Sequence, residues 1–313
     1  MTKGEQASKQ PVGLGVGRIR RLKRRQKKKV AKKEARKRTK LPGSFRLTWQ
    51  VFGIIRTYWK PLGGIVLVYL ILNIIFASGI SGLSSSVAEI KANLENGDKF
   101  WNAVGGFSSL VGSAGAGGSQ TASILQSVLI ILESLVIIWA LRQLLAGNAI
   151  RVKQAYYQAM APLIPFVLVI AVIFIQLLPL TLGAPIIGTI LATIFSSGGL
   201  LTTLFVLIFS ALAIWSFYMI SSSVFALYIV TLPDMQPRQA LRSAKNLVRF
   251  RRWPLMRRIF FLPIFIVVVM AALVVPLILF VSFLVAPVFY ILSMLVILFV
   301  HTYLYSLYRS LLE

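Results

Sequence analysis

Long uncharged apolar stretches recur along the chain and are separated by shorter polar or cationic segments. A helix needs about 20 mainly apolar residues to cross the hydrocarbon core of a bilayer. Judged by length and polarity, six stretches qualify as crossings, at about Leu62–Ala77, Ala122–Leu145, Pro162–Leu178, Leu200–Val230, Ile259–Val281 and Val285–Leu307. The pattern predicts an all-α fold, an integral membrane helical bundle with about six transmembrane helices.

Residues 186–231 carry no charge and are too long for one ordinary crossing. Two crossings would place the cationic stretch Pro237–Arg258 and the basic N-terminus on opposite sides of the membrane. Lys and Arg prefer the cytoplasmic side, so this arrangement is disfavoured. We therefore expect one long crossing here. Ile186–Phe195 is then a half-helix or interfacial segment, broken at Ser196–Gly199, and the third crossing ends at a turn over Pro179–Pro185.

An amphipathic segment precedes each odd-numbered crossing, at Ser44–Lys60, Arg151–Met160 and Pro237–Arg258. In the last of these, basic residues recur every three or four positions and form one stripe on a helix. The stripe consists of Arg238, Arg242, Lys245, Arg249 and Arg252. A neighbouring apolar arc lets the helix lie on the cytoplasmic face of a bilayer, with the cations against anionic headgroups. We predict one basic helix over 237–258 whose five cations bind anionic lipid.

The chain also shows a weak internal repeat. Gln154-Ala155 followed by Ala159 matches Gln239-Ala240 followed by Ala244, and each pair lies in an amphipathic segment. The repeating unit is an amphipathic helix followed by a membrane hairpin, used three times. Chance similarity between apolar sequences is the alternative explanation.

The N-terminal segment, residues 1–43, is polar and cationic. Of the 34 Lys and Arg in the chain, 17 lie in residues 1–40, and the formal net charge of the whole chain is +26. Such a block of like charges repels itself, so we expect a disordered tail. Because the first apolar core arrives only near Leu62, we expect the tail to be retained rather than cleaved as a signal peptide.

Two domains follow from this division: the basic cytoplasmic tail, residues 1–43, and a six-span membrane domain, residues 44–313. The membrane domain has one sizeable outer loop, over residues 78–121. An even number of crossings places both termini on the same side. The positive-inside preference makes that side the cytoplasm, and we expect the plasma (inner) membrane of a bacterium.

Composition agrees with a membrane protein and leaves little chemistry. Apolar residues make up 57% of the 313 residues, and the mean hydropathy is +0.80. The absence of Cys excludes thiol chemistry, disulfides and Cys-based metal sites. Eight scattered carboxylates and the single His301 are a poor set for a metal or acid–base enzyme, and no glycine-rich segment has the context of a phosphate-binding loop. We predict that the protein is not an enzyme and that it holds no metal and no cofactor.

Glu133 is the only acid inside a predicted crossing. An ionisable group in a membrane span is a candidate for function, because burying its charge without a partner is costly. Gln126 lies seven residues earlier on the same helical face, and His301 lies in the sixth crossing. The alternative is a protonated or hydrogen-bonded Glu133 that only fixes helix packing.

Two short motifs carry a resemblance to a known family. Thr231-Leu-Pro-Asp234 closes the fourth crossing, and Gln239-Ala-Leu-Arg-Ser-Ala244 opens the amphipathic segment before the fifth. The layout over residues 44–310 resembles the membrane domain attached to some glycerophosphoryl diester phosphodiesterases and its stand-alone bacterial relatives. The catalytic domain of those fusions is a separate soluble barrel, which this chain lacks, so their activity is not implied. The basic tail and the Gly-rich outer loop depart from the family pattern.

Three functions fit these observations. The first is a non-enzymatic membrane protein that binds anionic lipid at its cytoplasmic face and serves membrane organisation or supports transport. The second is a small transporter or channel that uses Glu133. The third is a membrane tether that binds RNA or a ribosome through the basic tail, since dense Lys and Arg neutralise phosphates regardless of sequence.

Overall fold

A computed structural model of the protein describes residues 42–77, 99–113, 120–194, 199–249 and 251–312. These residues belong to one compact unit, Pro42–Leu312. The predicted basic tail lies outside the described residues except for its last two positions, and so does most of the predicted outer loop. Within this loop, the structure describes one helix, α5 (Lys99–Ser113).

The described part of the chain is helical, and six of its segments are long and apolar enough to cross a membrane. The prediction of an all-α membrane bundle is therefore confirmed, and the chain is a multi-pass membrane protein. The crossings are formed by α3 (Trp59–Ala77), α6 (Gln120–Leu145), α8 (Leu163–Thr181) with α9 (Gly183–Ile194), α10 (Gly199–Val230), α12 (Arg252–Phe280) and α13 (Val285–Leu312). A short 3₁₀ helix, η1 (Ser282–Leu284), joins the last two.

Three shorter helices, α2 (Ser44–Thr57), α7 (Val152–Ala159) and α11 (Pro237–Val248), each precede a pair of crossings. The second and third of these helices each pack on the pair of crossings before them, and the first packs on the last pair. Helix α7 packs on α3 and α6, and α11 packs on α8 and α10, so each rests on the hairpin before it. Helix α2 has no hairpin before it and packs instead on the last one, where Phe45 meets Phe261 and Phe52 meets Phe299.

The repeated alanines are the contact points of α7 and α11. Ala155 and Ala159 of α7 are fully buried, and so are Ala240 and Ala244 of α11. Small side chains four residues apart let two helices approach closely. The sequence match between the two amphipathic segments therefore has a structural counterpart in how each segment packs.

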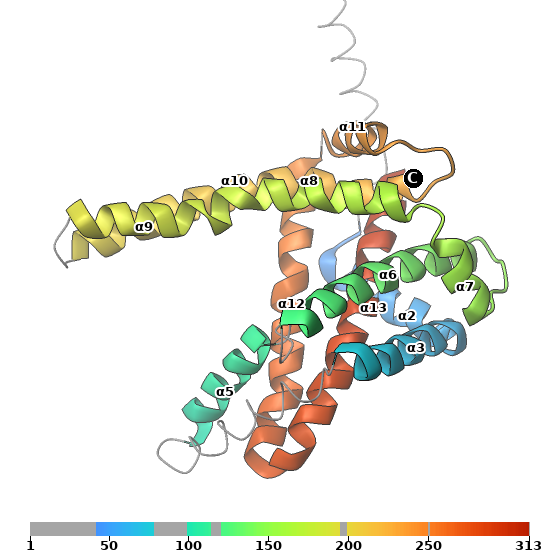
Figure 1. The fold of residues 1–313 in the computed structure, drawn as a ribbon, viewed down its shortest axis with the longest axis horizontal. Helices are drawn as coiled ribbons and strands as arrows, with labels where there is room; N and C mark the ends of the chain where they lie inside the picture. Colours follow the sequence, from blue (N-terminus) through green and yellow to red (C-terminus); the bar gives the residue numbers. More distant parts are fainter. Residues whose placement is uncertain (1–41, 78–98, 114–119, 195–198, 250, 313) are drawn as a thin grey trace, which may run out of the picture. The chain divides into compact units, whose positions relative to one another are not determined.

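Helix α9 continues from α8, so the prediction of a turn over Pro179–Pro185 was wrong. The Leu182 N–H donates to the Leu178 carbonyl at 2.9 Å, and the Ile186 N–H donates to the Leu182 carbonyl at 3.3 Å. Pro185 falls in the first turn of α9, where its missing N–H has no intrahelical partner to lose. Helices α8 and α9 together run alongside α10 (Figure 1). Phe195 and the predicted break at Ser196–Gly199 lie outside the described residues, except for Gly199, which begins α10.

The basic stretch Pro237–Arg258 forms two helices, so the prediction of one helix was also wrong. Helix α11 ends at Val248 and α12 begins at Arg252. Pro254 is the third residue of α12, where a helix accommodates proline because the first N–H groups have no intrahelical acceptor. The five predicted lipid-binding cations are therefore divided between α11, its C-cap residue Arg249 and α12.

Six crossings predict that α5 and α11 lie on opposite faces of the membrane, because three of them, α6, α8–α9 and α10, come between these two helices in the chain. The chain has no Cys, so single introduced cysteines report without background. Ser108 in α5 and Ser243 in α11 are exposed. We expect a membrane-impermeant maleimide to label Ser108→Cys and Ser243→Cys from opposite faces of sealed vesicles. Labelling of both from one face, with permeabilised vesicles as the control, would contradict six crossings.

Candidate functional site

Glu133, in the middle of α6, is only 1% exposed and contacts an amphipathic helix. The Tyr156 hydroxyl of α7 lies 2.9 Å from Glu133 Oε2 and 3.1 Å from the Ile65 backbone carbonyl of α3. Burial raises the pKa of Tyr156 above its ordinary value, so the hydroxyl keeps its proton. This one side chain therefore fastens α7 to both α3 and α6.

The hydrogen-bond count indicates that Glu133 is a neutral acid. A tyrosine hydroxyl has one hydrogen to donate, yet its two neighbours here are a carbonyl and a carboxyl oxygen. Both contacts are satisfied when the Glu133 carboxyl donates to the Tyr156 oxygen and Tyr156 donates to Ile65. Among the residues that the structure describes, no donor reaches Glu133 Oε1. A buried charge with one oxygen unpaired would be costly, so the neutral form fits the site.

A second hydrogen-bonded set of polar side chains joins α3 to α13. The Tyr290 hydroxyl donates to Asn73 Oδ1 at 2.7 Å, and Asn73 Nδ2 donates to the Tyr69 hydroxyl at 3.5 Å. Asn73, the polar interruption of the first crossing, is fully buried. The polar side chains at membrane depth thus link α7, α6, α3 and α13.

The three residues that the sequence singled out do not form one hydrogen-bonded group in the described part of the chain. Gln126 is half-buried on α6, two turns before Glu133. His301, on α13, has its Nδ1 3.3 Å from the Tyr228 hydroxyl of α10. Its ring lies within an aromatic group that also includes Tyr305 and Tyr308 around Tyr228. His301 therefore belongs to the contact between α10 and α13.

Arg142, near the end of α6, is an important residue that sequence reasoning missed. Its guanidinium donates to the Tyr228 carbonyl at 2.9 Å and to the carbonyl and hydroxyl of Thr231. These acceptors lie at the C-terminus of α10, where the helix dipole favours a cation. The Tyr228 carbonyl also accepts a hydrogen bond from the Thr231 hydroxyl at 3.0 Å. Thr231 opens the motif that ends at Asp234, whose backbone has a φ of 57° and turns the chain toward α11. The only signal in the sequence was a single arginine in the last turn of an apolar helix.

The predicted lipid-binding cations differ in their surroundings. Arg238, Arg242 and Lys245 are exposed along α11, and Arg249 is exposed at its C-cap. Ala240, Ala244 and Val248 of α11 are fully buried against the protein. The apolar face of α11 thus packs on α8 and α10 instead of lying on the bilayer.

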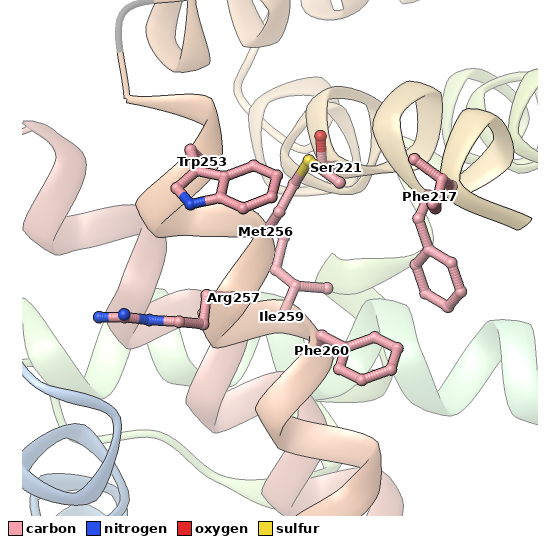
Figure 2. A pocket seen from close by; sticks show the side chains of 8 residues that line it. Phe217, Ser221, Trp253, Met256, Arg257, Ile259 and Phe260 are labelled. Carbon is pink, nitrogen blue, oxygen red and sulfur yellow. The ribbon is translucent and has the colours of Figure 1, made fainter. Parts of the chain in front are cut away.

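The fifth cation, Arg252, begins α12 and is half-buried, with its guanidinium carbon 4.6 Å from the centre of the Tyr218 ring of α10. A groove of about 260 Å³ opens beside this contact between α10 and α12 (Figure 2). Phe217 and Phe260 meet edge to face in its wall, with ring centres 5.6 Å apart. Figure 2 shows the guanidinium of Arg257 pointing away from these two rings.

Comparison of the chain with models of protein families, with curated proteins and with solved structures finds no match. The functional argument therefore rests on the residues of this chain.

The neutral state of Glu133 is tested by comparing Glu133→Gln with Tyr156→Phe. A glutamine amide donates to the Tyr156 oxygen as the acid does, so Glu133→Gln should leave the free energy of unfolding nearly unchanged. Tyr156→Phe removes both hydrogen bonds and should lower it by about 0.5–2 kcal/mol. Unfolding titrations in mixed micelles measure both.

Proton flux in proteoliposomes distinguishes packing from a relay at Glu133. If Glu133 carries protons, Glu133→Gln abolishes a flux that the wild type supports while the fold is retained. Equal flux in both proteins, or none in either, leaves packing as the role of Glu133.

In the unfolding titrations, a large loss of stability in Glu133→Gln would instead indicate a charged carboxylate.

Arg142→Gln should destabilise the protein by about 1.5–3 kcal/mol, because the end of α10 loses hydrogen bonds to a charged donor. Arg142→Lys should recover only part of this, since an ammonium cannot reproduce the planar fork of a guanidinium. Arg56, exposed on α2, offers the matched control Arg56→Gln. Equal unfolding free energies for Arg142→Gln and Arg56→Gln would contradict a stabilising role of Arg142 at the C-terminus of α10.

Proposed function

We propose that this protein is a non-enzymatic integral membrane protein that binds anionic lipid through one cationic face and serves membrane organisation or supports transport. The observation that carries the proposal is the arrangement of α11. Its buried alanines hold it on α8 and α10 while Arg238, Arg242 and Lys245 stay exposed. The cations therefore stand on a fixed scaffold.

The charges around α11 have no acidic side chain nearby in sequence to neutralise them. Between Asp234 and Glu313 the chain contains no Asp or Glu, although this segment holds nine Lys and Arg. Anionic headgroups are the counterions that a membrane offers to such a surface, and each nearby cation contributes about 1 kcal/mol to the attraction. This supports lipid as the partner.

Several contacts support placing these cations with the two ends of the described chain, Pro42 and Leu312, on one side, which we assign to the cytoplasm. The Arg258 side chain at the start of α12 donates to the Pro42 carbonyl at 2.8 Å. Arg309 near the end of α13 donates to the Leu145 carbonyl at 3.5 Å, and Arg142 joins the same end of α6 to the end of α10. The positive-inside rule favours the cytoplasmic face of a bacterial inner membrane for these cationic ends.

A second candidate function is a small transporter that uses Glu133, favoured by the buried Oε1 atom that has no donor among the described residues. The RNA or ribosome tether stays a prediction, because the tail lies outside those residues. The resemblance to the membrane domain of glycerophosphoryl diester phosphodiesterases also stays a prediction.

The lipid proposal is tested by the selectivity of the protein for spin-labelled phosphatidylglycerol over phosphatidylcholine in reconstituted membranes. Replacing Arg238, Arg242 and Lys245 together by Gln should lower the relative association constant at least about fivefold. The remaining selectivity should respond less to added salt, which screens exposed charges. The matched control replaces Gln239, Ser243 and Asn246, exposed on the same helix, by Ala.

Unchanged selectivity in the cation variant would remove α11 as the lipid-binding surface. Deleting residues 1–40 in the same assay separates the contribution of the tail. A tail peptide that binds RNA in a salt-resistant way, in preference to anionic vesicles, would favour the tether instead.

A further inference from the structure

The contact between Arg252 and Tyr218 locates the headgroup level on α10. The part of α10 from Gly199 to Ile220 is about 33 Å long at 1.5 Å per residue, which matches a hydrocarbon core of about 30 Å. Beyond it, Phe225, Ala226 and Tyr228 are fully buried beneath other helices. Trp215, Tyr218 and Trp253 are exposed near the boundary, as interfacial aromatic residues are. The start of α12 therefore lies where headgroups meet acyl chains.

Two apolar grooves flank the start of α12 at this level. The first is the 260 Å³ groove with Phe217 and Phe260, and it has Arg257 among its lining residues. The second, of about 780 Å³, has Tyr218 and Arg252 among its own. Ile214, Trp253 and Met256 line both grooves and form a ridge between them. The second groove thus combines an apolar wall with Arg252, whereas the guanidinium of Arg257 points away from the two phenylalanine rings of the first (Figure 2).

Arg252 is held in place by stacking. A guanidinium over a tyrosine face gains cation–π attraction, and such stacking leaves the N–H groups at its edge able to donate. Planar guanidinium groups bind phosphate oxygens in pairs. No acid occurs between Asp234 and Glu313 to compete for this cation. Trp253, 79% exposed, stands beside it at the depth preferred by indole rings.

We infer that the surface of α10 and α12 around Trp253 is a site for one anionic diacyl phospholipid. Its phosphate binds Arg252, and its two acyl chains lie in the grooves on either side of the Ile214–Trp253–Met256 ridge. The inference rests on the proposed function and deepens it, because it adds a saturable site to the diffuse attraction of α11. A phosphatidylcholine fits the grooves as well, so selectivity comes from its choline cation opposing Arg252.

The site is tested with the full-length protein by native mass spectrometry, counting dioleoyl-phosphatidylglycerol retained against dioleoyl-phosphatidylcholine. The wild type should retain one phosphatidylglycerol preferentially. Arg252→Gln should weaken this binding about tenfold, and Arg252→Lys should restore part of it. Ile214→Trp fills both grooves at an exposed position without changing charge and should weaken phosphatidylglycerol and phosphatidylcholine alike. Arg56→Gln is the charge-matched control and should bind as the wild type does.

A photoactivatable phosphatidylglycerol locates the site independently of stability. Its acyl-chain label should fall on peptides that contain residues 211–221 and 252–260. Labelling elsewhere, or equal retention of both lipids, would overturn the inference, as would retention that Ile214→Trp leaves unchanged. The α11 cation variant should lose its spin-label selectivity yet keep the single retained lipid, and Arg252→Gln should do the reverse. The two proposals therefore fail separately.

Discussion

The structure depends on one constraint: a polar group at membrane depth, or a helix end beside it, must find its partner within the protein. Water is absent there, and lipid tails offer no hydrogen bonds. Tyr156 meets this requirement for Glu133, Tyr290 for Asn73, and Arg142 for the end of α10. In each case the partner comes from a different helix, so satisfying the polar group also joins two helices. Since apolar helices gain little by exchanging lipid for each other, these contacts and close packing hold the bundle together.

The amphipathic helices extend this principle to the edge of the membrane. Each is attached to a hairpin other than the one it leads into, through buried alanines in α7 and α11 and through aromatic contacts in α2. The packing turns a linear series of three units into a closed set of contacts. It also decides what α11 presents outward: with its apolar side occupied by α8 and α10, its cations and uncharged polar side chains remain for a partner.

The sequence was sufficient for features that depend on length and local pattern. Six apolar stretches gave six crossings, and the alanine repeat fell on the packing faces of two helices. The prediction of helix ends failed at prolines, because proline can either end a helix or be accommodated in one. Pro179 and Pro185 looked like a turn but are accommodated within a nearly continuous rod, whereas Pro254 proved to sit in the first turn of a new helix. Arg142 was missed for another reason: its partners, Tyr228 and Thr231, are more than 80 residues away, and no local pattern encodes that distance.

The attachment of α2 to the last hairpin has a consequence for biosynthesis. A ribosome makes α2 early, yet the helices that cover its apolar face, α12 and α13, emerge only after more than 150 further residues. Until then Leu47 and Val51, which are buried in the folded chain, have only lipid around them, so the nascent helix has to remain at the membrane surface. The assembly is completed in one late step, when α12 and α13 pack against α2. Loss of the last hairpin would therefore leave the first helix of the membrane domain without its partner.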